Sequence, residues 1–430
     1  MILIAPARIA AFELLCRIEL QQAHSDDALN SETVGALEPR DRNLVTEIAY
    51  GTLRRRGWLD YILEDAVARA WEKVESKARI LLRLSLYQMS HMDRVPDHAI
   101  IHDAVELAKL HLRPRAAGFV NGVLRNLGRQ RPWLARDFHR DCPVWVRLSL
   151  PRWLWERWEA RFGCDRACEF AQALNRQPQT AFRMQVQADL HDGAQASDIV
   201  PGAYVLQKDV QLQGDRALRF QDEASQLIPH LLGPIEGCRV WDSCAAPGGK
   251  SAILMERIGP SGWLIASDLE PKRAWHLSEN LKLCSSARVD ILVADARMPF
   301  PFRGAPFDVV VADVPCSGLG TLRRNPEIKW RFQPEWLAGL HQKQSRLLDA
   351  VAGAVRRGGK LLYSTCSTEP EENEQVVEEF LLACPEFRLQ PPAGPPGVEA
   401  WLDEKGFFRS YPSARSWDSF FAALLVRASS

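Results

Sequence analysis

The chain carries no net charge, because 54 lysines and arginines balance 54 aspartates and glutamates. It also lacks an apolar run of about 18 residues, the minimum for a membrane-spanning helix. Arg8, Glu13 and Arg17 interrupt the apolar amino terminus at helical spacing. The lack of net charge argues against a strong overall attraction to nucleic acid. The lack of a long apolar run argues against a membrane span, and the charged residues near the amino terminus argue against a signal peptide. We therefore expect a soluble, cytoplasmic protein.

Closely spaced cysteines and two common phosphate-binding turns are missing as well. The ten cysteines are scattered along the chain without a CxxC pair. This pattern argues against a zinc site and a disulfide framework, and it favours reduced thiols. Neither GxGxxG, the turn of dinucleotide-binding enzymes, nor GxxxxGK[ST], the P-loop, occurs in the sequence.

The patterns that are present predict three domains. Residues 1–140 have helical periodicity almost throughout and form an all-α domain, with 80–89 as a central helix. Residues 141–234 mix a tryptophan-rich helical stretch with short extended pieces, typical of a small connecting α+β domain. In residues 235–430 apolar strands alternate with helices, which predicts an α/β domain with a mostly parallel sheet. We expect its strands near 240–242, 263–268, 291–295, 307–313, 360–365 and, antiparallel at or near the edge, 420–426.

One expected strand delivers a thiol at its carboxyl end. Residues 359–367 read GKLLYSTCS, an apolar run followed by small polar residues around Cys366. Ligands of open α/β sheets bind at the carboxyl ends of the strands. A cysteine at such a place is nevertheless more often a small buried hydrophobic residue, so its role depends on the other strand ends.

A glycine-rich turn follows the first strand of the same sheet. Its glycines let the backbone approach a ligand at a helix amino terminus, although such a turn can also be a tight connection. Asp268 ends the second strand, where a carboxylate can accept both hydroxyls of a ribose, and Asp295 ends the third, placed to meet an adenine. Together these features predict a nucleoside-bearing cofactor, either a hydride carrier or S-adenosylmethionine. The turn consists of Cys244, Ala245, Ala246, Pro247, Gly248, Gly249 and Lys250.

A second cysteine follows the fourth strand. Asp313 ends that strand, and Cys316 comes three residues later. In the usual strand order this strand lies beside the one that carries Cys366, so two thiols and a carboxylate share one sheet edge. Packing alone rarely produces such a set, which favours a functional site. A redox pair is the chemical competitor, but the two cysteines lack the CxxC spacing that tunes thioredoxin-like sites.

A basic stretch with one tryptophan, RRNPEIKWR over residues 323–331, lies directly downstream. Such a run is usually a solvated face. After a candidate catalytic loop, however, it is well placed to hold phosphates and to stack a base of RNA. The candidate RNA contacts are Arg323, Arg324, Lys329 and Trp330.

Three motifs, CAAPGGK, DVPCSGLGTLRRNPEIKW and STCSTEPEEN, resemble in this order the signatures of the Sun (Nol/Nop/Sun) family of RNA cytosine-5 methyltransferases. Residues 221–226 resemble the segment before the cofactor loop of that family, and 50–54, 86–88 and 118–125 resemble its NusB-like domain. The resemblance covers almost the whole chain and is greatest to bacterial members that act on 16S ribosomal RNA. It implies a Rossmann-like class I methyltransferase sheet behind an all-α NusB-like RNA-binding domain, with S-adenosyl-L-methionine as cofactor. We expect a monomer that binds RNA and no membrane.

The resemblance also implies a role for each site residue. Carbon 5 of cytosine is too poor a nucleophile to take a methyl group directly, so Cys366 first adds to carbon 6. Asp313 hydrogen-bonds the base near nitrogen 3 and contacts the methionine end of the cofactor, where Lys250 also lies. Cys316 serves release of the product. The target base must leave any stack, so single-stranded or looped RNA is the expected substrate.

Rival functions remain open at this stage. The same chemistry on transfer RNA or 23S ribosomal RNA would use the same motifs. A non-catalytic RNA-binding module on a NusB-like fold would explain the helical domain but gives no reason for both thiols. A dinucleotide oxidoreductase would need the GxGxxG turn that the chain lacks.

Overall fold

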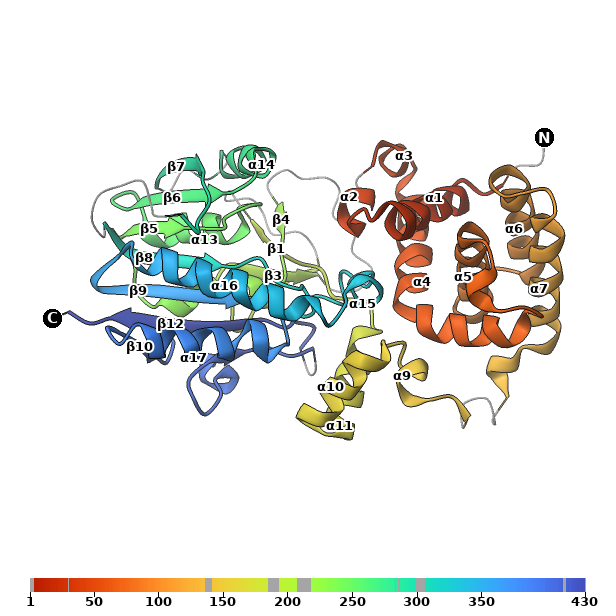
Figure 1. The fold of residues 1–430 in the computed structure, drawn as a ribbon. Coiled ribbons are helices and arrows are strands. Elements are labelled where there is room, and N and C mark those ends of the chain that lie inside the picture. The colour runs from red at the N-terminus through yellow and green to blue at the C-terminus, as the bar shows by residue number, and fades with distance from the viewer. Residues whose placement is uncertain are drawn as a thin grey trace. The chain divides into compact units, whose positions relative to one another are not determined.

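The computed structural model describes residues 4–29, 31–135, 141–184, 193–206, 218–282, 284, 287–298, 306–412 and 415–429. The chain divides into two compact units (Figure 1). The helical unit contains Met1–Gln177 and Leu322–Arg331, and the sheet unit contains Pro178–Thr321 and Phe332–Ser430. This division differs from the three domains expected from the sequence. Residues 141–177 of the expected connecting domain belong to the helical unit, and residues 178–234 belong to the sheet unit.

The helical unit packs around helix α5, Ser76–His91, which is buried continuously from Ile80 to Met89. Helices on several sides of α5 cover it, as expected for a central bundle helix. Its longer helices are α1 (Pro6–Gln21), α4 (Pro39–Ala66), α6 (Asp97–His111), α7 (Ala116–Gln130), α10 (Arg152–Phe162) and α11 (Cys164–Leu174). Its short helices are α2 (Ser25–Leu29), α3 (Glu32–Gly35), η1 (Trp71–Lys73), η2 (Pro132–Leu134), α9 (Val144–Arg147) and α15 (Ile328–Arg331).

The sheet unit contains a small antiparallel sheet and a large mixed one. The small sheet has the order β2-β3-β1-β4, formed by β1 (Ala181–Met184), β2 (Ala194–Ala196), β3 (Ala203–Leu206) and β4 (Leu218–Phe220). The large sheet has the order β10-β12-β9-β8-β5-β6-β7, with β11 paired to β12. Its strands are β5 (Arg239–Asp242), β6 (Trp263–Asp268), β7 (Arg288–Val293), β8 (Phe307–Asp313), β9 (Val355–Thr365), β10 (Phe387–Gln390), β11 (Phe408–Arg409) and β12 (Phe421–Arg427).

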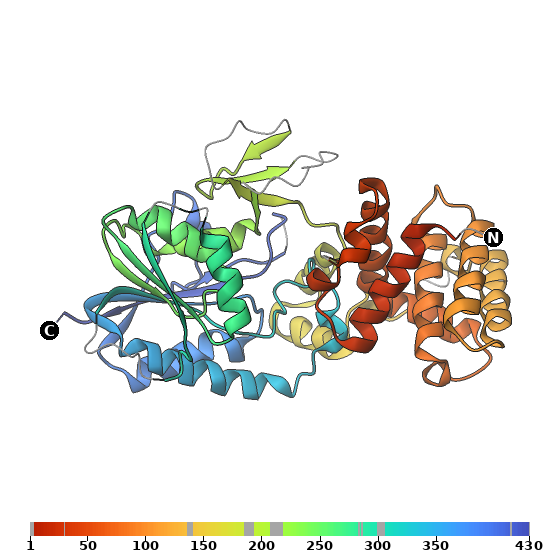
Figure 2. The ribbon, with the colours of Figure 1, turned by 90° about the horizontal axis from the view of Figure 1, so that it is seen from above.

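Helices cover the large sheet on both faces, and Figure 2 shows α13 and α14 on the side opposite to α16 and α17. Alternate residues of each strand enter two separate cores: Val309 and Val311 of β8 belong to one, and Val310 to the other. This alternation is typical of a sheet that is buried on both faces. The helices of this unit are α12 (Glu223–Leu227), η3 (Ile228–Leu232), α13 (Gly249–Ile258), α14 (Pro271–Leu281), α16 (Trp336–Ala352), η4 (Pro370–Glu372), α17 (Glu374–Ala383) and η5 (Val398–Trp401).

Strands β5 to β9 run parallel to one another, as the strand–helix alternation predicts. The last strand, β12, is antiparallel to β9 as expected, but β10 pairs with its other side and forms the edge. Strand β10 has only four residues, too few to stand out by periodicity. None of the helices in the described ranges is long and apolar enough to cross a membrane.

Candidate active site at the carboxyl edge of the large sheet

The carboxyl ends of four adjacent parallel strands bring the predicted site residues together. In the order β9, β8, β5 and β6, these strands end at Thr365, Asp313, Asp242 and Asp268. Cys366 follows β9 directly. Because this edge is where ligands bind in open α/β sheets, the topology makes it the candidate active site.

The two predicted thiols meet at this edge. The sulfurs of Cys316 and Cys366 lie 3.2 Å apart. The backbone amide of Cys366 donates a hydrogen bond to the sulfur of Cys316 at 3.4 Å. The amide of Gly320 donates to the carbonyl of Cys366 at 2.9 Å. The loop after β8 therefore folds back onto the end of β9, and the expected neighbourhood of the two cysteines is confirmed.

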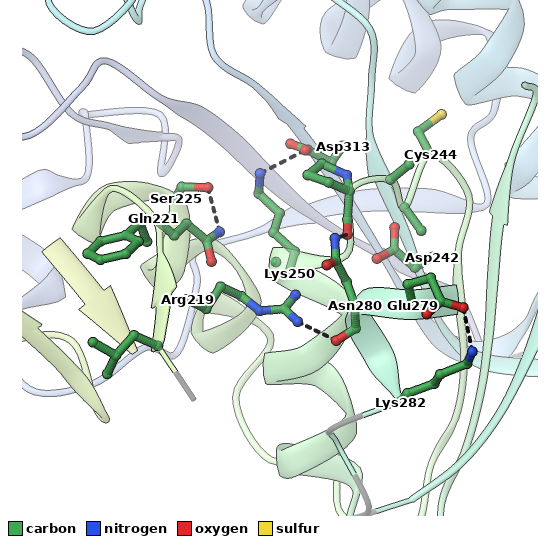
Figure 3. A pocket seen from close by; sticks show the side chains of 16 residues that line it. Arg219, Gln221, Ser225, Asp242, Cys244, Lys250, Glu279, Asn280, Lys282 and Asp313 are labelled. Atoms are coloured by element: carbon green, nitrogen blue, oxygen red, sulfur yellow. Dashed lines mark hydrogen bonds and ion pairs between the residues drawn. The ribbon is translucent and has the colours of Figure 1, made fainter. Parts of the chain in front are cut away.

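An ion pair links the glycine-rich turn to the end of β8. Nζ of Lys250 donates to Oδ2 of Asp313 at 2.7 Å (Figure 3), and the hydroxyl of Ser364 donates to Oδ1 at 2.7 Å. Burial by itself lowers the pKa of Lys250, but the charge and hydrogen bond of Asp313 outweigh it, so the pKa is raised. Lys250 therefore carries a positive charge at the sheet edge.

The glycine-rich turn leads into helix α13 as expected. Gly248 has φ of 103°, a left-handed conformation that favours glycine. Cys244 in the same turn is a poor candidate for a thiolate, because burial raises its pKa to about 12. The turn thus offers backbone donors and a cation rather than a second nucleophile.

Asp242, at the end of β5, is a buried carboxyl group with a free oxygen. Its Oδ2 accepts a hydrogen bond from the hydroxyl of Ser251 at 2.7 Å, whereas Oδ1 is buried without a partner among the described residues. Burial raises the pKa of Asp242 to about 7. An unpaired buried oxygen is costly, and a ligand with a donor, above all a cationic one, would satisfy it.

The two acids expected at a nucleoside differ in their surroundings. Asp268 is buried, accepts the amide of Glu270 at 3.2 Å and lies 3.3 Å from the guanidinium of Arg273. Asp295 lies two residues beyond the end of β7, and Arg297 binds both of its carboxylate oxygens. This hydrogen bonding with Arg297 lowers the pKa of Asp295.

Two cavities open at this edge, and Asp313 lines both. The first has a volume of about 490 Å³ and gathers the expected residues Cys244, Ala246, Asp268, Asp295, Asp313, Cys316 and Cys366. The second, about 740 Å³, is lined by Asp242, Lys250, most of the turn and strand β4 of the small sheet (Figure 3). The first cavity is therefore lined both by Asp268 and Asp295, the acids expected to bind a nucleoside, and by the two thiols. The second lies between the glycine-rich turn and the small sheet.

The basic stretch belongs to the helical unit. Lys329 is 1% exposed, and its Nζ donates to the carbonyls of Arg54 and Ser149 at 3.0 and 3.1 Å. The indole of Trp330 donates to the carbonyl of Leu53 at 2.7 Å, and Arg323 is buried. These contacts give Lys329 and Trp330 structural tasks inside that unit. RNA binding by Arg323, Arg324, Lys329 and Trp330 stays a prediction.

Three functional candidates emerge from the structure that the motifs did not single out: Asp242, Ser364 and Glu372. Asp242 carries a sequence signal, because it is one of four acids that end expected strands. Ser364 and Glu372 flank Cys366 in sequence, but their contacts with Asp313 and with the loop of Cys316 depend on tertiary structure.

Comparison with known proteins identifies the family. Residues 229–426 match the family model described as 16S rRNA methyltransferase RsmB/F, and residues 5–129 match the NusB family. The ribosomal RNA small subunit methyltransferase B of Pseudomonas putida is 32% identical over 442 residues, which cover 98% of both chains. That of Sodalis glossinidius is 31% identical over 443 residues, covering 98% of this chain and 97% of its own. The chain belongs to the RsmB/F methyltransferase family.

Solved structures agree with this membership. The crystal structure of PH0851 superposes with a TM-score of 0.82 at 26% identity and covers 99% of both chains. A methyltransferase homologue from Pyrococcus horikoshii, 25% identical, gives a TM-score of 0.54 and covers 66% of this chain and 97% of its own. The expected fold, a NusB-like helical region before a Rossmann-like methyltransferase sheet, is confirmed.

S-adenosyl-L-methionine is the cofactor of this RsmB/F family member, and the sheet edge fits it. The buried carboxylate of Asp268 suits ribose hydroxyls. The unpaired Oδ1 of Asp242 suits a cationic amino group. Cys244 and Ala246 of the glycine-rich turn line both cavities.

Proposed function

We propose that this RsmB/F family member methylates carbon 5 of a cytosine in 16S ribosomal RNA through a covalent bond to Cys366. The observation that carries the proposal is the pair of sulfurs of Cys316 and Cys366, 3.2 Å apart beside the ion pair of Lys250 and Asp313. The names of the relatives, ribosomal RNA small subunit methyltransferase B, support ribosomal RNA as the substrate.

In the first step the thiol of Cys366 loses its proton to water, and its sulfur bonds to carbon 6 of the cytosine. The electron pair of the carbon 5–carbon 6 double bond then makes carbon 5 nucleophilic. Asp313 hydrogen-bonds the base edge near nitrogen 3, and the positive charge of Lys250 stabilises the electron-rich ring. S-adenosyl-L-methionine supplies the methyl group that carbon 5 takes up.

Release requires a base close to the nucleophile. Carbon 5 must lose its hydrogen as a proton so that the bond between Cys366 and carbon 6 breaks and the ring double bond returns. The pKa of Cys316 is raised well above its ordinary value, first by its hydrogen bond with Cys366 and then by burial. Cys316 lies beside the sulfur that must leave, and after its own proton has passed to water its thiolate takes the proton from carbon 5.

The proposal is tested by incubating the full chain with methyl-labelled S-adenosyl-L-methionine and 16S ribosomal RNA, 23S ribosomal RNA or transfer RNA. We expect label on carbon 5 of a cytosine in 16S ribosomal RNA, and mapping of the modified base checks this. Label on another RNA alone would reassign the substrate, and label on adenine would overturn the chemistry.

Cysteine variants test the division of roles. Cys366→Ala should abolish methylation, whereas Cys316→Ala should accumulate a covalent adduct of RNA and protein that is visible on a denaturing gel. Cys384→Ala, a partly buried cysteine outside both cavities, is the matched control and should methylate normally. Methylation retained by Cys366→Ala would remove Cys366 as the nucleophile.

A further inference from the structure

The loops that carry the two thiols meet at a buried glutamate. Glu372 ends the short helix η4 and is 0% exposed. Its carboxylate accepts from the amide and hydroxyl of Ser317, from the hydroxyl of Ser367 and from the side-chain amide of Gln344. A carboxylate has about four acceptor sites, so these donors use them all.

The positions of these donors matter because each serine directly follows a cysteine. The amide of Ser317, next to Cys316, donates to Oε1 of Glu372 at 2.7 Å, and its hydroxyl donates to Oε2 at 2.5 Å. The hydroxyl of Ser367, next to Cys366, donates to the same Oε2. The two hydroxyl oxygens lie 3.2 Å apart, the same separation as the two sulfurs. One carboxylate thus bridges the two cysteine loops.

The residue after Glu372 reinforces this bridge from the side of β9. Oδ1 of Asn373 accepts from the hydroxyl of Thr365 at 2.5 Å, and its side-chain amide donates to the carbonyl of Ser367 at 3.0 Å. The hydroxyl of Tyr363 donates to the carbonyl of Glu372 at 2.6 Å. Backbone and side chains of the turn are therefore fixed against the strand that delivers Cys366.

The charges around the two sulfurs are unequal. Besides the hydrogen bond with Cys366 and burial, the charge of Glu372 raises the pKa of Cys316. Cys366, by contrast, interacts with the positive charge of Lys250. Two other groups near the sulfurs do not cancel this inequality of charge. The carboxylate of Asp313 is paired with Lys250, and burial raises the pKa of Tyr363 well above its ordinary value, so its hydroxyl stays neutral.

We propose that Glu372 is the positioning residue of the thiol pair: it holds the two loops so that the sulfurs stay in contact, and its charge disfavours a thiolate at Cys316. The proposal rests on the proposed function, which makes Cys366 the nucleophile and Cys316 the base. Glu372 acts through Ser317 and Ser367 rather than on the substrate. When the pair loses one proton to water, the remaining proton stays on Cys316.

Two isolated thiol reactions test this role without RNA or cofactor. Alkylation of each cysteine by iodoacetamide, followed across pH by peptide mass spectrometry, reports which thiol ionises. Oxidation by diamide reports their proximity, because diamide accepts two electrons and two protons as the two sulfurs form one disulfide bond. The variants are Glu372→Gln, which removes the charge, and Glu372→Asp, which keeps the charge but shortens the side chain. Glu379→Gln, on the exposed face of α17, is the matched control.

In the wild type Cys366 should be alkylated at lower pH than Cys316. In Glu372→Gln the alkylation of Cys316 relative to Cys366 should rise about tenfold, as expected for one unit of pKa. In Glu372→Asp the order of alkylation should persist, while disulfide closure slows about tenfold or more, because a small displacement of reacting groups is costly. Glu379→Gln should match the wild type in both reactions.

Unchanged alkylation in a folded Glu372→Gln, or unchanged disulfide closure in Glu372→Asp, would overturn the proposal. If Glu372→Gln does not fold, the closure rate of Glu372→Asp decides alone. A protein that behaves as expected in both thiol reactions but transfers no methyl group to RNA would contradict the proposed function and leave the role of Glu372 intact.

Discussion

The ammonium of Lys250 and the carboxylate of Asp313 lie 2.7 Å apart where helix α13 begins and strand β8 ends. The second oxygen of Asp313 accepts from Ser364, the residue two positions before Cys366. Donors from a turn and from a neighbouring strand thus fix the carboxylate in one orientation. This arrangement links the cofactor turn to the strand of the proposed nucleophile through a single side chain.

Lys250→Met should lower the rate of methylation about 100-fold, the usual cost of removing one electrostatic donor from an active site. The aliphatic stem is kept, so the loss comes from the charge and from the freed carboxylate of Asp313. The measurement is the single-turnover rate with saturating RNA and cofactor. The control is Lys282→Met. Lys282 is exposed, pairs with Glu279 and lines the same 740 Å³ cavity as Lys250, and its variant should react at the wild-type rate. A wild-type rate in Lys250→Met would remove the ion pair from the mechanism.

Asp242→Asn should stabilise the cofactor-free protein at neutral and higher pH. Because the folded state raises the pKa of Asp242 to about 7, it holds the proton more tightly than the unfolded chain does. The wild type therefore loses stability as pH rises from about 4 to about 7, by an amount of the order of 4 kcal/mol. The variant has no charge to bury and should lack this decline.

Unfolding in urea at about pH 5 and about pH 8 measures the effect of Asp242→Asn. The stability difference between variant and wild type should grow over this interval, whereas Asp290→Asn, at a more exposed carboxylate, should show no such growth. Binding of S-adenosyl-L-methionine by Asp242→Asn should weaken at least about tenfold, because the charge-assisted hydrogen bond to a cationic group is lost. Equal pH slopes in variant and wild type would show that Asp242 is not a buried, protonated acid.

Much of the sheet unit can be predicted from the sequence because its strands are short apolar runs with an acid at the end. Strands β6 and β8 end at Asp268 and Asp313 as expected, and the usual strand order correctly makes β8 and β9 neighbours. The 3.2 Å contact of the sulfurs cannot be predicted in this way. It depends on loop geometry that Glu372 fixes from a distance of 55 residues along the chain from Ser317.

The basic stretch could not be interpreted from its sequence. Its composition predicts an exposed surface, whereas tertiary contacts bury part of it. Nothing in the sequence of residues 323–331 indicates that Lys329 is buried. Its partners, the carbonyls of Arg54 and Ser149, are 275 and 180 residues away. The division into two units escapes prediction for the same reason, since Leu322–Arg331 belongs to the helical unit while the chain on either side belongs to the sheet unit.

Gly320→Ala should damage the loop of Cys316. A Cβ atom at this position would lie 2.0 Å from the carbonyl oxygen of Ser419 and 2.8 Å from that of Cys366, so backbone would have to move. We expect methylation to fall by about 100-fold or more, as for other misplaced reacting groups. Gly339→Ala, with open space in helix α16, should keep full activity and be slightly more stable. Full activity in Gly320→Ala would mean that the loop tolerates displacement.

Lys329→Met should loosen the helical unit and change its response to pH. The methionine fills the same volume but leaves the carbonyls of Arg54 and Ser149 without their donor, at a cost of about 1–3 kcal/mol. Burial holds the pKa of Lys329 well below its ordinary value, so the unfolded chain binds the proton more tightly. Wild-type stability therefore rises with pH between the lowered pKa and the ordinary value of 10.5, and the variant should lack this rise.

Hydrogen exchange over α4 and α15 measures this change in the unit that contains Lys329. Amides of both helices should exchange faster in Lys329→Met, and the excess over wild type should grow as pH rises, after correction for the intrinsic pH dependence of exchange. Lys405→Met, at an exposed lysine paired with Glu378, controls for the loss of one positive charge and should exchange like the wild type. A variant that exchanges like the wild type over α4 would mean that Lys329 does not hold this unit together, and the basic stretch would again be open to a role in binding RNA.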